Sequence, residues 1–481
     1  MRKIKLLVTI CSYGETNLRL LQQIIQTYRS MTMEVDVIVL SEAPKNLGPE
    51  IRVVVGLPSR NPFSLPFAHK PIFAGNVDQY DLFAYSEDDI GVTEVNIRAF
   101  LSATDQLESE EIAGFLRYEV DESGRWFVSE PWGHYHWKPE SVRRRGDYTV
   151  AEFTNEHAGF YMLTQSQLRK AIASGGFLRA PYNGRYDMRE AAATDPYTSC
   201  GFRKVICISN LEDFLVHHMS NRYTSQLPVS LASFKEQIQT LIRIGDGVHP
   251  QTTLCEVESK LWSSGWQKSY YEQPREEWLQ MLPKDAATVL SIGCGWGATE
   301  ERLKQRGAKV TALPLDSVIG AAAARRGIEV IYGTLEGCFK TLDGRRFDCV
   351  LLTNLLHLQP NPGYLVEHSS RFVRAGGALL LHGINFDRIP WFIRRHYGSG
   401  QFRKLRTYEM SGISTCSPGT VARSIRKSGL RVAGVRWLNH TINQRRIRGN
   451  LIPLGRLTAR EWVLLAQRRQ QHHRGIDKGF E

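Results

Sequence analysis

Val289-Leu-Ser-Ile-Gly-Cys-Gly-Trp-Gly297 joins an apolar run to three alternating glycines, and a helix-like segment follows at residues 298–306. Glycine tolerates the sharp turn between a strand and a helix, and it allows a nucleotide to approach the backbone. The first turn of the helix adds free N–H groups. The pattern predicts a ligand-binding loop at Gly293, Gly295 and Gly297, although such a triplet alone is as often an ordinary turn.

Five short apolar runs, separated by intervals of helix length, continue this pattern. They lie at residues 288–292, 309–313, 329–332, 349–353 and 378–381. Strands that alternate with helices form parallel sheets, because each crossover helix returns the chain to the same edge. We therefore predict an α/β domain with a parallel, Rossmann-like sheet in the C-terminal half.

Three further landmarks follow the glycines, at residues 347–354, 355–358 and 372–381. With them, residues 286–385 resemble the class I methyltransferases, which transfer a methyl group from S-adenosylmethionine. The resemblance implies that 347–354 is the fourth strand, that 355–358 is the loop after it, and that 372–381 turns into the fifth strand.

The resemblance also implies which residues hold S-adenosylmethionine. Ser291 and Pro314 stand where the family has acids at the ends of the first two strands, and Asp316 is the expected substitute for binding the ribose. Thr334 and Leu335 would lie near the adenine, and Asn354 and Leu355 would line the methyl-transfer chamber. The implied cofactor-binding residues are Ser291, Gly293, Gly295, Gly297, Asp316, Thr334 and Asn354.

Methyl transfer to a hydroxyl benefits from a base, and histidine has a suitable pKa. His357 and His382 follow predicted strand ends, where an acceptor would arrive. We predict His357 as the catalytic base. The alternative for both residues is an ordinary hydrogen-bonded loop histidine.

The N-terminal half has its own α/β pattern. Residues 5–10 and 35–40 are predicted strands that flank a helix at 17–28, and the proline-rich residues 56–71 are predicted as a loop. A strand at 80–86 leads into Glu87, Asp88 and Asp89, here called the acid triplet. Neighbouring carboxylates repel one another unless a cation or hydrogen-bond donors neutralise them, so the triplet suggests a divalent metal site, with solvated surface as the alternative.

Three later segments, at residues 157–164, 187–190 and 216–218, follow the acid triplet. In this order the motifs resemble glycosyltransferases of the GT-A fold, which use nucleotide-sugar donors. The resemblance implies Mn²⁺ or Mg²⁺ held by the acid triplet and His217, with Glu190 or Asp187 as the general base. Asp195 is an alternative base, and a helix-start ion pair is the alternative for Asp187 and Glu190. The aromatic residues between Trp126 and Trp137 would form an acceptor-sugar surface or a core corner.

Length, charge and cysteine content complete the prediction. A chain of 481 residues is too long for one ordinary core, and its eight scattered cysteines favour a reducing cytoplasm. The formal net charge is +12, and basic residues cluster at 445–474, which predicts a solvated helical face or contact with the anionic inner face of a membrane. The predicted parts are a GT-A-like domain at 1–250, a helical connector at 251–284, a methyltransferase domain at 285–440 and a basic tail at 441–481.

Together these features predict a bifunctional cytoplasmic enzyme. It would transfer a sugar to a glycan acceptor and a methyl group to a glycan hydroxyl, in the synthesis of a surface polysaccharide or glycolipid. The alternative is a methyltransferase whose N-terminal half binds substrate without catalysis. We do not expect a nucleic-acid partner, because the sequence contains no recognised RNA-binding module.

Overall fold

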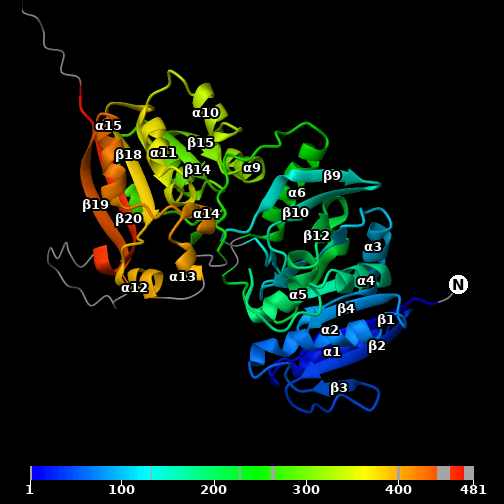
Figure 1. Cartoon of the computed structure of the whole chain (residues 1–481). Helices are drawn as coiled ribbons and strands as arrows, with labels where there is room; N and C mark the ends of the chain where they lie inside the picture. Colours follow the sequence, from blue (N-terminus) through cyan, green and yellow to red (C-terminus); the bar gives the residue numbers. More distant parts are fainter. Residues whose placement is uncertain are drawn as a thin grey trace, which may run out of the picture. The chain divides into compact units, whose positions relative to one another are not determined.

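The computed structural model describes residues 3–131, 133–226, 229–261, 266–397, 401–440 and 456–470 (Figure 1). The chain divides into two compact units, unit 1 at Met1–His249 and unit 2 at Pro250–Glu481. No described helix combines the length and the apolar content needed to cross a bilayer.

Unit 1 is built on a five-stranded sheet with the order β11-β4-β1-β2-β3. Four of its strands are parallel, and β11 runs antiparallel to β4. Helix α1 (Leu18–Arg29) buries residues 21, 24, 25 and 28, the spacing of one helix face. The predicted strand–helix–strand opening is confirmed. The strands are β1 (Lys5–Cys11), β2 (Glu34–Ser41), β3 (Arg52–Val55), β4 (Leu82–Glu87) and β11 (Phe160–Thr164).

Two four-stranded sheets complete unit 1, with the orders β6-β12-β10-β9 and β5-β13-β7-β8. Their strands are β5 (Ile90–Gly91), β6 (Glu111–Ala113), β7 (Leu116–Val120), β8 (Trp126–Val128), β9 (Trp137–Arg145), β10 (Tyr148–Phe153), β12 (Arg203–Cys207) and β13 (Leu215–His218). The helices of unit 1 after α1 are η1 (Pro62–Ala68), α2 (His69–Gly75), α3 (Glu94–Thr104), α4 (Gln165–Ala173), α5 (Met188–Thr198), η2 (Ile208–Phe214) and α6 (Leu231–Gly245).

Residues 56–71 differ from the predicted loop, because η1 and the start of α2 lie within them. The side chain of Asn61 accepts a hydrogen bond from the backbone of Phe63, and Pro62 stands at the first helical position. Proline is favoured there because its fixed φ suits the helix and its missing N–H is not needed. Leu65 and Phe67 are buried, so packing supplies the remaining stability.

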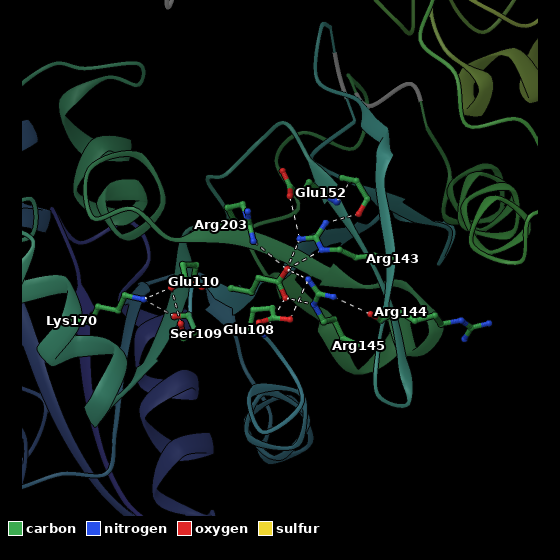
Figure 2. Close-up of polar contacts among 11 residues, drawn as sticks. Glu108, Ser109, Glu110, Arg143, Arg144, Arg145, Glu152, Lys170 and Arg203 are labelled. Carbon is green, nitrogen blue, oxygen red and sulfur yellow. Dashed lines mark hydrogen bonds and ion pairs between the residues drawn. The ribbon is translucent and has the colours of Figure 1, made fainter.

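A buried carboxylate joins three strands of the second sheet of unit 1. Glu111 in β6 accepts hydrogen bonds from Nε of Arg143 (2.9 Å) and Nε of Arg145 (2.8 Å) in β9, and Arg203 in β12 lies 3.5 Å away. Figure 2 shows the three arginines converging, with the exposed pair of Glu110 and Lys170 to one side. Burial alone would raise the pKa of Glu111, but the arginines outweigh it and lower this pKa to about 2.

Unit 2 contains one seven-stranded sheet with the order β16-β15-β14-β17-β18-β20-β19 (Figure 1). The five predicted strands are confirmed, and they are parallel. Strand β20 runs antiparallel to both of its neighbours. The strands are β14 (Thr288–Cys294), β15 (Lys309–Pro314), β16 (Glu329–Val330), β17 (Phe347–Thr353), β18 (Val373–Ile384), β19 (Leu430–His440) and β20 (Ala459–Arg468).

The helices of unit 2 include α8 after β14, α9 after β15 and α11 after β17. Their order along the chain is α7 (Glu276–Leu279), α8 (Ala298–Gln305), α9 (Ser317–Arg325), α10 (Leu335–Thr341), η4 (Leu356–Leu358), α11 (Pro362–Ser370), α12 (Ile389–Tyr397), α13 (Gln401–Lys404), α14 (Tyr408–Ser411) and α15 (Pro418–Lys427).

Two predicted boundaries of the C-terminal half need correction. Strand β20 lies inside the sheet, so residues 459–468 belong to the fold and not to a basic tail; Arg445, Arg446, Arg448 and Arg474 lie outside the described residues. The described part of the connector at 251–284 is mostly not helical, and α7 is the one named helix in it. It packs on unit 2, where the backbone N–H groups of Leu254 and Lys260 donate to Leu315 and Ser411 (both 2.8 Å).

Candidate functional sites

The glycine loop of unit 2, residues 293–297, makes the predicted turn from β14 into α8. Gly293 and Gly297 have φ values of 76° and 85°, which favour glycine. A Cβ at Gly295 would lie 2.2 Å from the carbonyl oxygen of Tyr270, and one at Gly293 would lie 2.9 Å from Cδ2 of Leu355. The backbone at Tyr270, in the segment that precedes β14, therefore occupies the space that the missing side chain of Gly295 leaves free.

Ser291, which stands where an acid was expected, binds one from the next helix. Its hydroxyl donates to Oε1 of Glu300 over 2.6 Å, and both residues are buried. Burial raises the pKa of Glu300. Glu300 thus supplies the carboxyl group beside the glycine loop, and sequence analysis missed it. Its position in the first turn of α8 was the available signal.

Lys268 is a second residue that sequence analysis missed. Its side chain is 1% exposed, and Nζ donates to the carbonyl oxygen of Thr353, the last residue of β17, over 2.9 Å. Nζ also lies 3.6 Å from a carboxylate oxygen of Glu272. A buried ammonium group at a strand end requires such partners, because desolvation of an isolated charge is costly. Lys268 therefore fixes the segment before β14 to the carboxyl edge of the sheet.

Asp316 and Thr334 both begin helices. Oδ1 of Asp316 accepts hydrogen bonds from the backbone of Val318 (2.7 Å) and Ile319 (2.8 Å), and the residue is 3% exposed. The hydroxyl of Thr334 accepts one from the backbone of Gly337. These contacts are ordinary helix caps. Ribose binding by Asp316 and adenine contact by Thr334 stay predictions.

Asn354 has the features expected of a ligand-binding residue. It follows β17 with a φ of 50°, an uncommon value for a residue other than glycine. Its Oδ1 is buried and accepts no hydrogen bond from the described part of the chain. The neighbouring Leu355 packs against Gly293. A buried oxygen without a donor calls for a ligand or a water molecule, so Asn354 and the glycine loop together fit a small molecule that carries N–H or O–H groups.

The structure does not support His357 as the catalytic base. The side chain is fully buried, and Nε2 donates to the carbonyl oxygen of Trp266 over 2.9 Å. Burial lowers the pKa of His357 to about 3, so the imidazole is a weak proton acceptor. His382 is also buried, within β18, and its Nε2 contacts Glu461 of β20 at 3.2 Å. Both histidines are therefore packed, hydrogen-bonded residues, as the alternative prediction stated.

Unit 1 contains a cavity of about 700 Å³, here called the unit 1 cavity. Its walls include the acid triplet at the end of β4, residues of η1 and the start of α5. Several predicted site residues meet there, together with histidines and arginines. They are Glu87, Asp88, Asp89, Arg117, His157, Arg189, Glu190, His218 and Arg222.

Each carboxylate of the acid triplet has its own protein partner. Glu87 lies 3.3 Å from Nε2 of His157, and Asp88 accepts a hydrogen bond from Asn17 over 2.7 Å. Asp89 accepts hydrogen bonds from Arg222 and His218, both over 3.1 Å. The pKa of Asp89 is lowered, because these donors outweigh the effect of burial, whereas burial raises the pKa of Asp88.

The partners of the acid triplet bear on the predicted metal site. In the described ranges, no group of three or more histidine, cysteine, aspartate or glutamate side chains is placed to hold a metal ion. His218 and Arg222 supply positive charge at Asp89 instead. Binding of Mn²⁺ or Mg²⁺ at the acid triplet stays a prediction.

His218, and not the predicted His217, is the histidine that contacts the acid triplet. His217 contacts Asn221 at 3.1 Å and stacks on Tyr118 with ring centroids 4.8 Å apart, whereas His218 reaches Asp89. Successive residues of a strand point to opposite faces, so only one of the pair can face the cavity. Nδ1 of His218 also contacts Glu119 at 2.5 Å, which fixes the ring.

The three candidate bases of unit 1 lie in different surroundings. Asp187 caps α5 by accepting hydrogen bonds from the backbone of Arg189 (2.9 Å) and Glu190 (3.2 Å), as the helix-start alternative predicted. Asp195 is fully buried and pairs with Lys70. Glu190 lines the unit 1 cavity, and it is the candidate that the structure brings to the acid triplet.

Only part of the described aromatic segment at 126–137 is a core corner, since Trp137 is buried and Trp126 is exposed. Trp126 stacks on Tyr118 with centroids 4.2 Å apart, and the buried Trp137 packs against Phe153 at 5.0 Å. Tyr135 lines the unit 1 cavity, and Trp132 lies outside the described residues.

Comparison with known proteins concerns unit 2. Residues 290–381 match the family model described as "Methyltransferase domain". The chain is 31% identical over 110 residues to the ubiquinone biosynthesis O-methyltransferase of Coxiella burnetii, covering 22% of this chain and 47% of that protein. It is 34% identical over 103 residues to the protein of the same name from Pseudomonas aeruginosa, covering 20% of this chain and 44% of that protein. The chain thus spans about half the length of the curated relatives it matches.

Among solved structures, a SAM dependent methyltransferase from Archaeoglobus fulgidus is similar to 40% of this chain and 90% of its own, with 13% identity and a TM-score of 0.31. The resemblance of unit 1 to GT-A glycosyltransferases stays a prediction.

Proposed function

From the class I methyltransferase domain at residues 290–381, we propose that this chain transfers a methyl group from S-adenosylmethionine to a hydroxyl group of a glycan acceptor. The observation that carries the proposal is the family match over the glycine loop and Asn354, whose buried Oδ1 has no donor among the described residues. Unit 1 would bind the acceptor in its cavity.

The residues at the carboxyl edge of β14 and β17 have distinct parts in this proposal. S-adenosylmethionine supplies, when bound, a methyl group on a positively charged sulfur. Asn354 would hold the cofactor through its free acceptor oxygen, and Leu355 would form an apolar wall beside Gly293. Glu300 and Lys268 would keep the glycine loop and the preceding segment in place.

Calorimetric titration with S-adenosylhomocysteine tests the cofactor assignment. We expect the whole chain to bind it and Asn354→Ala to bind about fivefold more weakly, since one lost hydrogen bond costs about 1 kcal/mol. Asn361→Ala is the matched control, because Asn361 caps α11 and has a structural role. No binding by the unchanged chain, or equal binding by Asn354→Ala, would contradict the proposal.

A second candidate function is sugar transfer from a nucleotide-sugar donor in unit 1. The meeting of the acid triplet, Glu190 and His218 in one cavity favours it. In this reading Glu190 would accept the proton of the acceptor hydroxyl, and Arg222 and His218 would face the anionic donor. Asp89 would orient both cations.

Nucleotide-sugar hydrolysis distinguishes the two roles of unit 1. If unit 1 transfers sugars, hydrolysis should be measurable, should persist with a chelator and should be lost in Glu190→Gln. If unit 1 only binds the acceptor, hydrolysis should be absent from the unchanged chain as well. Loss of activity with a chelator would instead support the predicted metal site at the acid triplet.

A further inference from the structure

Helix α12 of unit 2 (Ile389–Tyr397) exposes an apolar face. Ile389, Phe392, Ile393 and Tyr397 are 47%, 53%, 50% and 84% exposed. Their spacing of three, four and eight residues from Ile389 places them on one side of the helix. Single exposed apolar residues are common on proteins, but four on one face of a nine-residue helix need an explanation.

The opposite side of α12 is anchored to unit 2. The ring of Trp391 lies 4.9 Å from that of Trp266 and 5.3 Å from that of Phe386. Trp391 packs on a small apolar cluster formed by Leu261, Trp266, Ile384, Phe386, Leu405 and Ile413. The exposed face is therefore held outward by a packed tryptophan, and the helix does not need its outer residues for its own attachment.

The lysine and arginine residues between Asp387 and Glu409 form a segment without acidic residues. Residues 388–408 contain six basic residues and no acidic residue; the six are Arg388, Arg394, Arg395, Arg403, Lys404 and Arg406. Arg403, Lys404 and Arg406 are exposed, and none of them forms an ion pair with an acid in the parts of the chain that the structure describes. A charged partner for this face must consequently be anionic.

We propose that α12 and the adjoining basic residues dock unit 2 on an anionic phospholipid membrane. An amphipathic helix lies in the membrane interface when apolar residues enter the headgroup boundary and basic residues meet anionic lipids. Nine residues are too few to span a bilayer, so the helix lies on the surface. Charge favours an anionic membrane over a protein as the partner of this face. A protein partner that binds through apolar contacts would not require an acid-free segment of this length.

The docking face lies near the proposed methyl-transfer site. Helix α12 follows the carboxyl end of β18, and the backbone of Asn354 donates to His382 of that strand over 3.2 Å. Docking would bring this edge of the sheet to the lipid surface. Resting on the proposed function, this points to an acceptor glycan carried on a lipid anchor.

Vesicle co-sedimentation with the whole chain tests the docking. We expect sedimentation with vesicles of phosphatidylcholine mixed with phosphatidylglycerol, little with phosphatidylcholine alone, and weaker binding at high salt. The double variant Phe392→Ser/Ile393→Ser and the charge variant Arg403→Glu/Lys404→Glu should each bind about tenfold more weakly. Leu178→Ser is the matched control, since Leu178 is 50% exposed in unit 1.

Two further measurements make the result decisive. All variants should keep the melting temperature and the S-adenosylhomocysteine affinity of the unchanged chain, which separates docking from folding and from the proposed function. Equal sedimentation of the unchanged chain and Phe392→Ser/Ile393→Ser would overturn the proposal. A concentration-dependent dimer in light scattering that this double variant abolishes would identify a second copy as the occupant instead.

Discussion

Asp187 and Glu190 stand three positions apart, yet their carboxylates do different work. Asp187 closes the first turn of α5, whereas Glu190 reaches the unit 1 cavity. Asp187→Ala should lower the free energy of unfolding by about 1 kcal/mol, because an N-cap is lost. Urea denaturation measures this loss, and Asp187→Ser, which keeps a capping oxygen, should restore most of it. An unchanged midpoint for Asp187→Ala would show that the cap contributes nothing.

His218 should make stability depend on alkaline pH. Burial alone would lower its pKa, but hydrogen bonds to Asp89 and Glu119 raise it to about 9. A pKa raised above the unfolded value near 6.5 means that the stabilisation is complete below about pH 6.5 and is lost as pH rises through about 9. It amounts to at most about 3 kcal/mol. The free energy of unfolding in urea, measured between about pH 6.5 and about pH 9, should fall as pH rises. In His218→Gln this pH dependence should be much weaker.

His217→Gln is the matched control for that titration, because His217 hydrogen-bonds to Asn221, whereas His218 pairs with Asp89 and Glu119. A pH profile that His217→Gln flattens as much as His218→Gln would contradict the assignment of His218.

Individual site residues were only partly predictable from the sequence. Gly293, Gly297 and Glu190 carry their signal in local pattern, and the structure places all three at turns or cavity walls. The choice between His217 and His218 depends on which face of β13 meets the cavity, and no local pattern records that. Glu300 was not predicted as a site residue because its hydrogen-bond partner, Ser291, lies on another element.

The junction of β6, β9 and β12 should control acid stability. Since the pKa of Glu111 is lowered to about 2, its stabilisation is present above about pH 4.5 and is lost as pH falls toward 2. Glu111→Gln should cost about 2 kcal/mol at neutral pH, because the charge-assisted hydrogen bonds from the half-buried Arg143 and Arg145 are weakened. Chemical denaturation at several pH values measures both effects. Glu110→Gln, at an exposed pair, should change little; a similar loss in both variants would refute this account.

Strands that are buried on both faces were predicted from the sequence, whereas strands that contain both apolar and basic residues were not. Strands β14 and β17 read as continuous apolar runs, because helices cover both sides of a parallel sheet. Strands β19 and β20 carry arginines at several positions, such as Arg431 and Arg468, and their sequence resembles a solvated basic segment. Pairing with β18 decides their structure, and this long-range contact leaves no local pattern.

The two units should be separable at residue 250 but not at residue 285. A fragment of residues 250–481 retains Leu254, Lys268 and Trp278, which are buried in unit 2. A fragment that begins at 285, the boundary expected from sequence, exposes their contact surfaces. We expect the longer fragment to unfold cooperatively on heating and to bind S-adenosylhomocysteine, and the shorter one to aggregate. Comparable melting curves for the two fragments would show that the preceding segment is dispensable.

The placement of β20 between β18 and β19 has a consequence for synthesis on the ribosome. Strand β18 ends at residue 384 and its neighbour begins at residue 459, so the nascent chain carries an unpaired, apolar edge until translation passes that point. Unpaired edges template association with other chains. A nonsense mutation between these positions should therefore yield insoluble product rather than a shortened enzyme, and a chaperone that shields the edge should matter most during this interval.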